Sequence, residues 1–199
     1  MRCFIGIGLP PAVRDAVSDA VRGLGETKGP VSWIAKANLH VTLKFLGEIR
    51  TERVSSAGEA LAGAVAGFPP FALDAFGGGT FPGPRNPRVL WVGFREPLEL
   101  VGKLQQNIEN ALSGAGFPRE DRPFHPHITV GRVRGILPPA WGDRFVQGLA
   151  GRGFGTVPVL SIVLFESRLS PGGAIYSVVR EFPFGKPPVR RETEEENTR

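Results

Sequence analysis

A short phrase that occurs twice constrains this chain more than any other feature. Residues 39–43 read Leu-His-Val-Thr-Leu, and residues 126–130 read Pro-His-Ile-Thr-Val. The chain contains three histidines, and two of them, His40 and His127, stand at the same position of this phrase. The β-branched residues of both copies favour a strand, in which residues i and i+2 share a face. We therefore expect two strands that each place a histidine and a threonine on one face and apolar side chains on the other.

Two such strands, brought together, would form a cleft that contains two imidazoles and two hydroxyls. The histidine side chain titrates near neutral pH, so one imidazole can act as a base while the other acts as an acid. The hydroxyls of Thr42 and Thr129, with neighbouring backbone N–H groups, are suited to binding phosphoryl oxygens. This set of groups predicts in-line attack at a phosphodiester, and we expect no metal and no other cofactor.

Two other interpretations of the histidines remain open. They could be hydrogen-bonded groups of the folded core, although the twin placement makes this the weaker alternative. His125 and His127 share a strand face, and His40 could complete a three-histidine zinc site. No cluster of Asp, Glu or Cys adjoins the motifs, which argues against that site. We expect His125 to be structural or to support its neighbour.

The composition fits a folded protein with a basic surface. The chain has 199 residues, 41% of them hydrophobic, and a net charge of +5. Most of its basic residues are arginines, which suit phosphate, although a codon bias would explain them equally well. No apolar run is long enough to span a membrane, and the first residues lead into a strand rather than a signal peptide. We expect a cytoplasmic monomer, and the charge permits a nucleic-acid partner.

The order of the expected elements predicts an α+β fold. Strands are expected over residues 2–8, 31–34, 39–46, 71–76, 89–94, 159–165 and 175–182, the last two around a turn at 170–173. Helices are expected over residues 11–24, 51–68, 97–113 and 138–149, the second with Thr51 as its N-cap. A loop rich in Gly, Pro and Arg is expected over residues 77–88.

This order forms a rough repeat, because each half contains helices and a His-x-Thr strand followed by further strands. We therefore expect one bilobal domain over residues 1–185, with helices outside antiparallel strands. A parallel sheet of βαβ units ranks second. Residues 186–199 carry many charges and no apolar cluster, so we expect a disordered tail there.

The longer context of the motifs resembles the two-histidine phosphoesterase superfamily. Within it, the chain is similar to the RNA 2′,3′-cyclic phosphodiesterases, also called 2′-5′ RNA ligases. The resemblance lies in residues 2–7, 33, 39–48, 81–82, 88–91 and 124–132. It implies two antiparallel sheets that face a central cleft, with helices outside. It also implies hydrolysis of a 2′,3′-cyclic phosphate at an RNA 3′ end to a 2′-phosphate, with the reverse 2′-5′ ligation in some members.

The same resemblance implies roles for the four motif residues. His40 would donate a proton to the leaving 3′-oxygen, and His127 would accept a proton from the attacking water. Thr42 and Thr129 would hold the phosphate. Two alternatives remain: a phosphodiesterase of a small cyclic phosphate or of 2′-5′ oligoadenylate, and a non-catalytic protein that binds RNA ends.

Four further residues are candidates for substrate contacts. Phe45 and Arg132 match positions that contact the nucleotide in this superfamily. Their odd spacing from the histidines places them on the wrong face of a regular strand, so a bulge or a strand end is required. Phe45 could equally be a core residue. Arg85 and Arg88 are candidates for contacts with RNA phosphates.

Overall fold

The computed structural model describes residues 1–24, 30–170 and 173–185. The strands are β1 (Arg2–Gly8), β2 (Val31–Trp33), β3 (His40–Glu48), β4 (Phe71–Phe81), β5 (Val89–Phe94), β6 (Ile128–Val133), β7 (Gly153–Val159), β8 (Ser161–Ser170) and β9 (Gly173–Pro183). The helices are α1 (Pro11–Leu24), α2 (Glu52–Val65), α3 (Glu99–Gly114) and α4 (Trp141–Leu149), with a 3-10 turn, η1, at Lys36–Asn38. Every ladder between these strands is antiparallel, so the α+β prediction is confirmed and the parallel alternative is wrong.

The strands form two lobes that meet at β6 and β3. They pair in the order β7-β4-β5-β6-β3-β1-β8-β9, and β2 pairs with β6. We call the strands from β7 to β6, with β2, α1 and α4, the β6 lobe, and the strands from β3 to β9, with α2 and α3, the β3 lobe. A single residue pair, Val41 with Ile128, joins β3 to β6. The two expected sheets are thus linked at one point into one hydrogen-bonded path.

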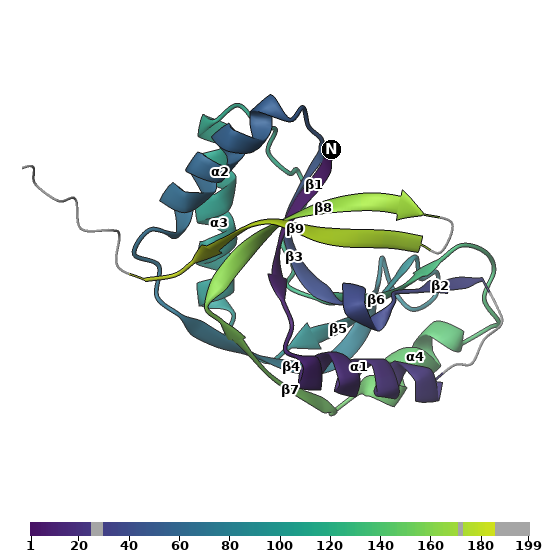
Figure 1. The fold of residues 1–199 in the computed structure, drawn as a ribbon. Helices are drawn as coiled ribbons and strands as arrows, with labels where there is room; N and C mark the ends of the chain where they lie inside the picture. Colours follow the sequence, from purple (N-terminus) through teal and green to yellow (C-terminus); the bar gives the residue numbers. More distant parts are fainter. Residues whose placement is uncertain (25–29, 171–172, 186–199) are drawn as a thin grey trace, which may run out of the picture.

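Two helices leave the lobe of the strand that precedes them and pack on the other lobe. β1 belongs to the β3 lobe, but α1, which follows it, packs against β7 and α4, and the next strand, β2, also lies in the β6 lobe. β5 and β6 belong to the β6 lobe, but α3, which connects them, packs against α2 and β3. Figure 1 shows the two resulting helix pairs, α2 with α3 and α1 with α4, on separate sides of the molecule. This crossing of the connections supports the proposal that residues 1–185 form one domain.

The glycine-rich segment after residue 76 continues a strand instead of forming the expected loop. β4 runs on to Phe81, with a bulge where Gly77 adopts a φ of 62°. A Cβ at Gly78 would collide with Leu149 of α4, and a Cβ at Gly79 would collide with the indole of Trp91. The glycines are there to admit neighbouring side chains, so their turn-like composition is misleading.

The start of α2 and the strand β7 differ from the sequence analysis. Thr51 is the N-cap residue of α2, as predicted, but it has a helical conformation and its side chain makes no capping bond. β7 was not predicted, because two glycines and a proline hide its alternation. Among the described strands it is an edge strand that pairs with β4 alone.

The predicted disordered tail at 186–199 lies outside the described residues. Within the described ranges, no helix combines the length and the apolar character needed to cross a bilayer.

A buried ion pair fastens α3 to β3 just after the first motif. Lys44 Nζ donates to Glu109 Oε1 at 2.7 Å and to the Pro118 carbonyl at 2.8 Å. The two side chains are only 1% and 10% exposed. Removing one member of such a pair leaves the other as an uncompensated buried charge.

We expect Lys44→Met to lower the free energy of unfolding by about 3–5 kcal/mol, because Glu109 would lose its cation. The double variant Lys44→Met/Glu109→Leu should recover most of this loss, since an apolar pair of similar size leaves no buried charge. Urea denaturation of the parent, the two single variants and the double variant measures both effects. A single variant as stable as the parent would show that the pair does not anchor α3.

Candidate active site

The two His-x-Thr motifs lie side by side where the lobes join. Val41 and Ile128, the central residues of the motifs, face each other across β3 and β6. Opposed residues of an antiparallel pair are related by a local two-fold axis that passes between them. Both central side chains are fully buried, so the histidines and threonines project from the other face, as predicted. His40 and His127 therefore lie on opposite sides of this axis, on the same face.

Hydrogen bonds at both ring nitrogens and two aromatic side chains hold the His40 imidazole in place. Nδ1 donates to the Asn38 carbonyl at 2.7 Å, since a carbonyl can only accept. In the neutral ring Nε2 is then an acceptor, and the Thr42 hydroxyl lies 3.0 Å from it. The rings of Phe4 and Tyr176 pack against the imidazole, with centroids at 4.7 Å and 5.2 Å. These contacts fix the tautomer and the direction of Nε2.

An equivalent backbone hydrogen bond at Nδ1 and two aromatic side chains hold the His127 imidazole in place. Nδ1 donates to the His125 carbonyl at 2.7 Å, again two residues before the histidine. Phe81 packs edge-on against the imidazole at 5.2 Å, and Trp91 lies at 6.4 Å. His125 thus contributes its backbone to the site, in keeping with the expected supporting role. Both motifs present Nε2 as the nitrogen available for chemistry.

Burial lowers the pKa of both imidazoles below the ordinary histidine value. For His40 the bond to the Asn38 carbonyl opposes this shift, and the charges of His127 and Arg132 add to it. For His127 the bond to the His125 carbonyl opposes the shift, and the charges of Arg132 and His125 lower the pKa further. The positive charge of Arg132 thus lowers the pKa of both imidazoles.

A bulge brings Phe45 onto the face of the histidines. Thr42 pairs with Gly6 and Lys44 pairs with Ile5, so Leu43 is an extra residue in β3. Beyond this bulge Phe45 pairs with Phe4, whose ring also contacts His40. The Phe45 side chain is 52% exposed, which excludes the core alternative.

A matching bulge brings Arg132 onto the same face. Thr129 pairs with Trp91 and Gly131 pairs with Leu90, so Val130 is an extra residue in β6. Arg132 then pairs with Val89. Val89 lies two residues before Trp91, so both residues, and Arg132 opposite Val89, lie on the histidine face. The bulge that the sequence required is present in both strands, directly after each motif. Phe45 and Arg132 are thus equivalent positions, each five residues after its histidine.

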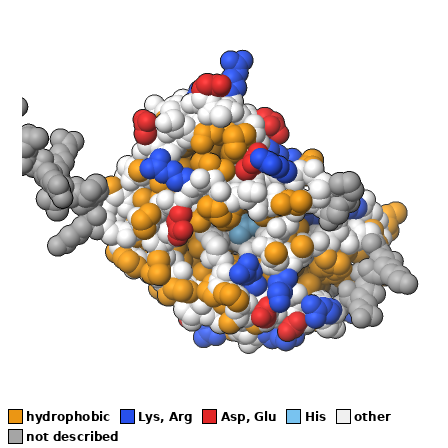
Figure 2. Space-filling model, in the orientation of Figure 1, with side chains coloured by type: hydrophobic (Ala, Val, Ile, Leu, Met, Phe, Trp, Pro, Cys, Tyr) orange, Lys and Arg blue, Asp and Glu red, His pale blue; other side chains and the backbone are white. Residues whose placement is uncertain are grey.

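Arg85 and Arg88 do not join the motif residues. They line a separate groove of about 350 Å³ to which no histidine contributes. A second pocket of about 350 Å³ does lie beside His127, with mainly apolar walls that include Phe76, Phe81 and Trp91. In Figure 2 a histidine is visible near the centre of the face, with basic side chains beside it.

The three-histidine zinc alternative has no support in the geometry. Within residues 1–24, 30–170 and 173–185, no three His, Cys, Asp or Glu side chains are grouped so that they could hold a metal ion. Both His125 and His127 precede β6, and both line the pocket beside Phe81, but His125 is exposed.

Sequence reasoning missed the aromatic residues that hold the imidazoles. Phe4, Tyr176, Phe81 and Trp91 come from four different strands. Their contact with the histidines depends on which strands pair, and a local pattern does not contain that information. The alternation of β1, with Phe4 and Gly6 on the face opposite Ile5, was the one available signal.

Both halves of the chain match one family of phosphoesterases. The sequence model of the LigT-like phosphoesterases matches residues 7–91 and 93–176. The chain belongs to this family. Each matched stretch contains one His-x-Thr motif at nearly the same distance from its start, which agrees with the repeat seen in the sequence and with the paired bulges.

Individual LigT-like relatives cover almost the whole chain. Proteins named RNA 2′,3′-cyclic phosphodiesterase from Thermotoga maritima and Archaeoglobus fulgidus are 34% and 35% identical, over 92% of this chain and 96% and 99% of theirs. The structure of E. coli LigT complexed with 3′-AMP matches with a TM-score of 0.74 and 26% identity, over 93% of this chain and 98% of that one. A structure from Thermus thermophilus matches with a TM-score of 0.73 and 28% identity, over 92% of this chain and 98% of that one. The expected fold is confirmed.

We expect the imidazoles of His40 and His127 to titrate below the ordinary histidine value of about 6.5 in solution. Arg132→Gln should raise both pKa values, because a nearby positive charge disfavours the imidazolium form. Nitrogen NMR of the histidine rings measures each pKa and also reports which nitrogen carries the proton. Arg134→Gln, which removes an exposed arginine two residues on, is the matched control. Unchanged titration in Arg132→Gln would contradict the placement of this guanidinium.

Proposed function

We propose that this LigT-like protein hydrolyses a 2′,3′-cyclic phosphate at an RNA 3′ end to a 2′-phosphate. The observation that carries the proposal is the pair of imidazoles on opposite sides of one local two-fold axis, each with Nδ1 bound to a backbone carbonyl. In-line displacement needs a base and an acid on opposite sides of phosphorus. The names of the relatives point to the same substrate. The proposal includes the cytoplasmic, monomeric state expected from the sequence.

In this mechanism each imidazole moves one proton through Nε2. His127, neutral at Nε2, accepts a proton from water as the water oxygen bonds to phosphorus. The bond from phosphorus to the 3′-oxygen breaks, and that oxygen takes a proton from Nε2 of protonated His40. Solvent then returns the two histidines to their starting states. The carbonyl partner of Nδ1 in both rings supports this assignment, because it requires the proton on Nδ1 and leaves Nε2 for the substrate.

The remaining residues of the site would bind the substrate. Thr42 and Thr129 donate hydroxyl hydrogen bonds to the non-bridging oxygens, and Arg132 compensates their negative charge. Exposed Phe45 offers an aromatic face for the terminal base on the His40 side. No metal takes part in this scheme, and the donor set of the described residues supports that choice.

Reverse 2′-5′ ligation is a second candidate, favoured by the apolar pocket beside His127. If water attacks from the His127 side, an RNA 5′-hydroxyl in ligation attacks from the same side. The pocket could hold the nucleoside that carries this hydroxyl, between Phe81, Phe76 and Phe94.

We expect the protein, treated with excess chelator, to open an oligonucleotide that ends in a 2′,3′-cyclic phosphate. Phosphorus NMR of the product should show a 2′-phosphate, because the 3′-oxygen is assigned to His40. Uridine 2′,3′-cyclic phosphate and 2′-5′ oligoadenylate serve as the competing substrates. A 3′-phosphate product would reverse the roles of the two histidines. Binding without turnover would favour the non-catalytic RNA-end-binding alternative, and loss of activity on chelation with rescue by zinc would contradict the metal-free scheme.

His40→Ala and His127→Ala should each reduce kcat by roughly 10²–10⁴-fold or more, because each removes one proton transfer. The double variant should lose far less than the product of the two, since the histidines act as a unit. Single-turnover assays measure these losses, and binding of the oligonucleotide should survive in all three. His125→Ala is the comparison variant: alanine retains the carbonyl that binds Nδ1 of His127, so its loss in kcat should be much smaller than that of His127→Ala. An active His127→Ala protein would overturn the assignment.

A further inference from the structure

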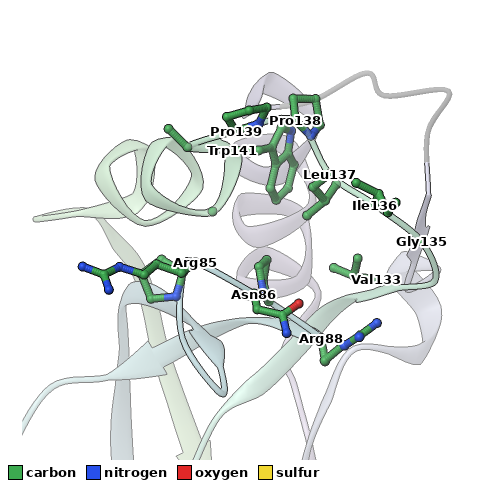
Figure 3. A pocket seen from close by; sticks show the side chains of 14 residues that line it. Arg85, Asn86, Arg88, Val133, Gly135, Ile136, Leu137, Pro138, Pro139 and Trp141 are labelled. Atoms are coloured by element: carbon green, nitrogen blue, oxygen red, sulfur yellow. The ribbon is translucent and has the colours of Figure 1, made fainter.

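We propose that the groove beside Arg132 binds the RNA strand on the 5′ side of the cyclic phosphate. This inference rests on the proposed function, because it assigns the next part of the same substrate. One wall of the groove is the loop of residues 84–88, and the other is the segment of residues 135–142 that leads into α4. Figure 3 shows the two walls facing each other, with Arg85 and Arg88 at either end of the loop and Trp141 on the opposite side.

The charge of the groove suits a polyanion. Arg85 and Arg88 are exposed, and no Asp or Glu is found among the described residues that line the groove. The ion pairs found among the described residues do not include either arginine. Two guanidinium groups are therefore available to bind phosphate oxygens, which they can do with two donors at once.

The opposite wall suits bases more than it suits a free phosphate. Ile136 is 95% exposed, and Leu137, Pro138 and Pro139 continue an apolar surface beside it. Grooves that bind single-stranded nucleic acids combine basic residues for the phosphates with aromatic side chains for the bases. Here aliphatic and proline side chains supply the apolar surface for the bases. A small anion would use only the arginines and would leave this wall exposed to water.

The loop that carries the arginines is held in place by its backbone. The Arg88 N–H donates to the Phe81 carbonyl at 2.7 Å, and the Arg88 carbonyl accepts from the Val133 N–H at 2.9 Å. At the other end, Pro84 rests on Gly142 of α4 so closely that a Cβ on this glycine would collide with the Pro84 carbonyl. The groove is thus a built feature of the fold, with both walls positioned against each other.

The groove lies at the end of β6, the strand that follows the second motif. Val133 lines the groove, and its neighbour Arg132 acts on both catalytic imidazoles. Neighbouring residues of a strand point to opposite faces, so Val133 and the groove lie on the other face of β6 from Arg132. Because β6 ends at Val133, a chain that leaves the site past Arg132 can pass around the end of this strand and then meet Arg88 and Arg85.

The test compares a short and a long substrate with the same end. Uridine 2′,3′-cyclic phosphate occupies only the site, whereas a tetrauridylate with a 2′,3′-cyclic phosphate also reaches the groove. We expect Arg85→Ala/Arg88→Ala to reduce kcat/KM on the tetranucleotide by about tenfold more than on the mononucleotide, chiefly through KM. The matched control is Arg22→Ala/Arg50→Ala, which removes the same charge at exposed positions outside the groove.

A salt titration separates specific contacts from a general loss of charge. The dissociation constant of a tetrauridylate with a 3′-phosphate, measured by fluorescence anisotropy, should have a logarithmic salt slope that falls by about 1.4 in the groove variant, the value for two lost phosphate contacts. The control variant should keep the slope of the parent protein.

The outcomes distinguish the two levels of inference. If the parent turns over neither substrate, the proposed function fails, and the salt slope alone then decides whether the groove binds RNA. If the parent turns over both substrates and the groove variant loses equally on both, with an unchanged slope, the groove inference is overturned while the proposed function stands. Equal effects of the groove and control variants would assign the loss to net charge and would also overturn it.

Discussion

One backbone pair, Val41 with Ile128, brings the two halves of the candidate site together. A ladder of a single pair cannot hold two sheets in register by itself, because neighbouring pairs normally share that task. The helix crossings supply the missing constraint. α1 and α3 each pack on the lobe opposite to the strand that precedes them, so the lobes cannot separate without exposing the buried stripes of both helices. The position of the imidazoles therefore depends on core packing far from the cleft, including the Lys44–Glu109 pair that fastens α3 to β3.

The two bulges turn a repeated sequence into an asymmetric site. Without them Phe45 and Arg132 would point into the core, where a guanidinium without a partner would be costly. With them, an aromatic ring and a cation occupy equivalent positions around two equivalent histidines. A symmetric pair of histidines cannot choose which oxygen of a cyclic phosphate leaves. The choice must come from how the ribose and base are held, and Phe45 and Arg132 are the first positions at which the two halves differ on this face.

The sequence was most informative where the signal was local. The alternation around His40 and His127 correctly predicted which side chains are buried, and the parity of Phe45 and Arg132 correctly required a bulge. It was misleading where composition reflects tertiary contact, as in the glycines of β4, which make room for Leu149 and Trp91. The sequence did not predict which strands pair. It therefore did not predict the aromatic rings around each imidazole, or that Arg85 and Arg88 line a groove apart from the motif residues. Those contacts join residues far apart in the chain, and no local propensity encodes them.

The electrostatics of the site link its proton state to its ligand. Acid–base catalysis needs one proton shared between the two histidines, yet burial and Arg132 lower the pKa of both and favour the state in which both are neutral. In the proposed mechanism a cyclic phosphate bound between the imidazoles would add a negative charge and oppose this shift, because an anion stabilises an imidazolium. By linkage, binding of such a substrate would promote uptake of the proton that catalysis needs. Arg132 would then have two effects: it disfavours the imidazolium form in the absence of substrate, and it attracts the phosphate that restores that form.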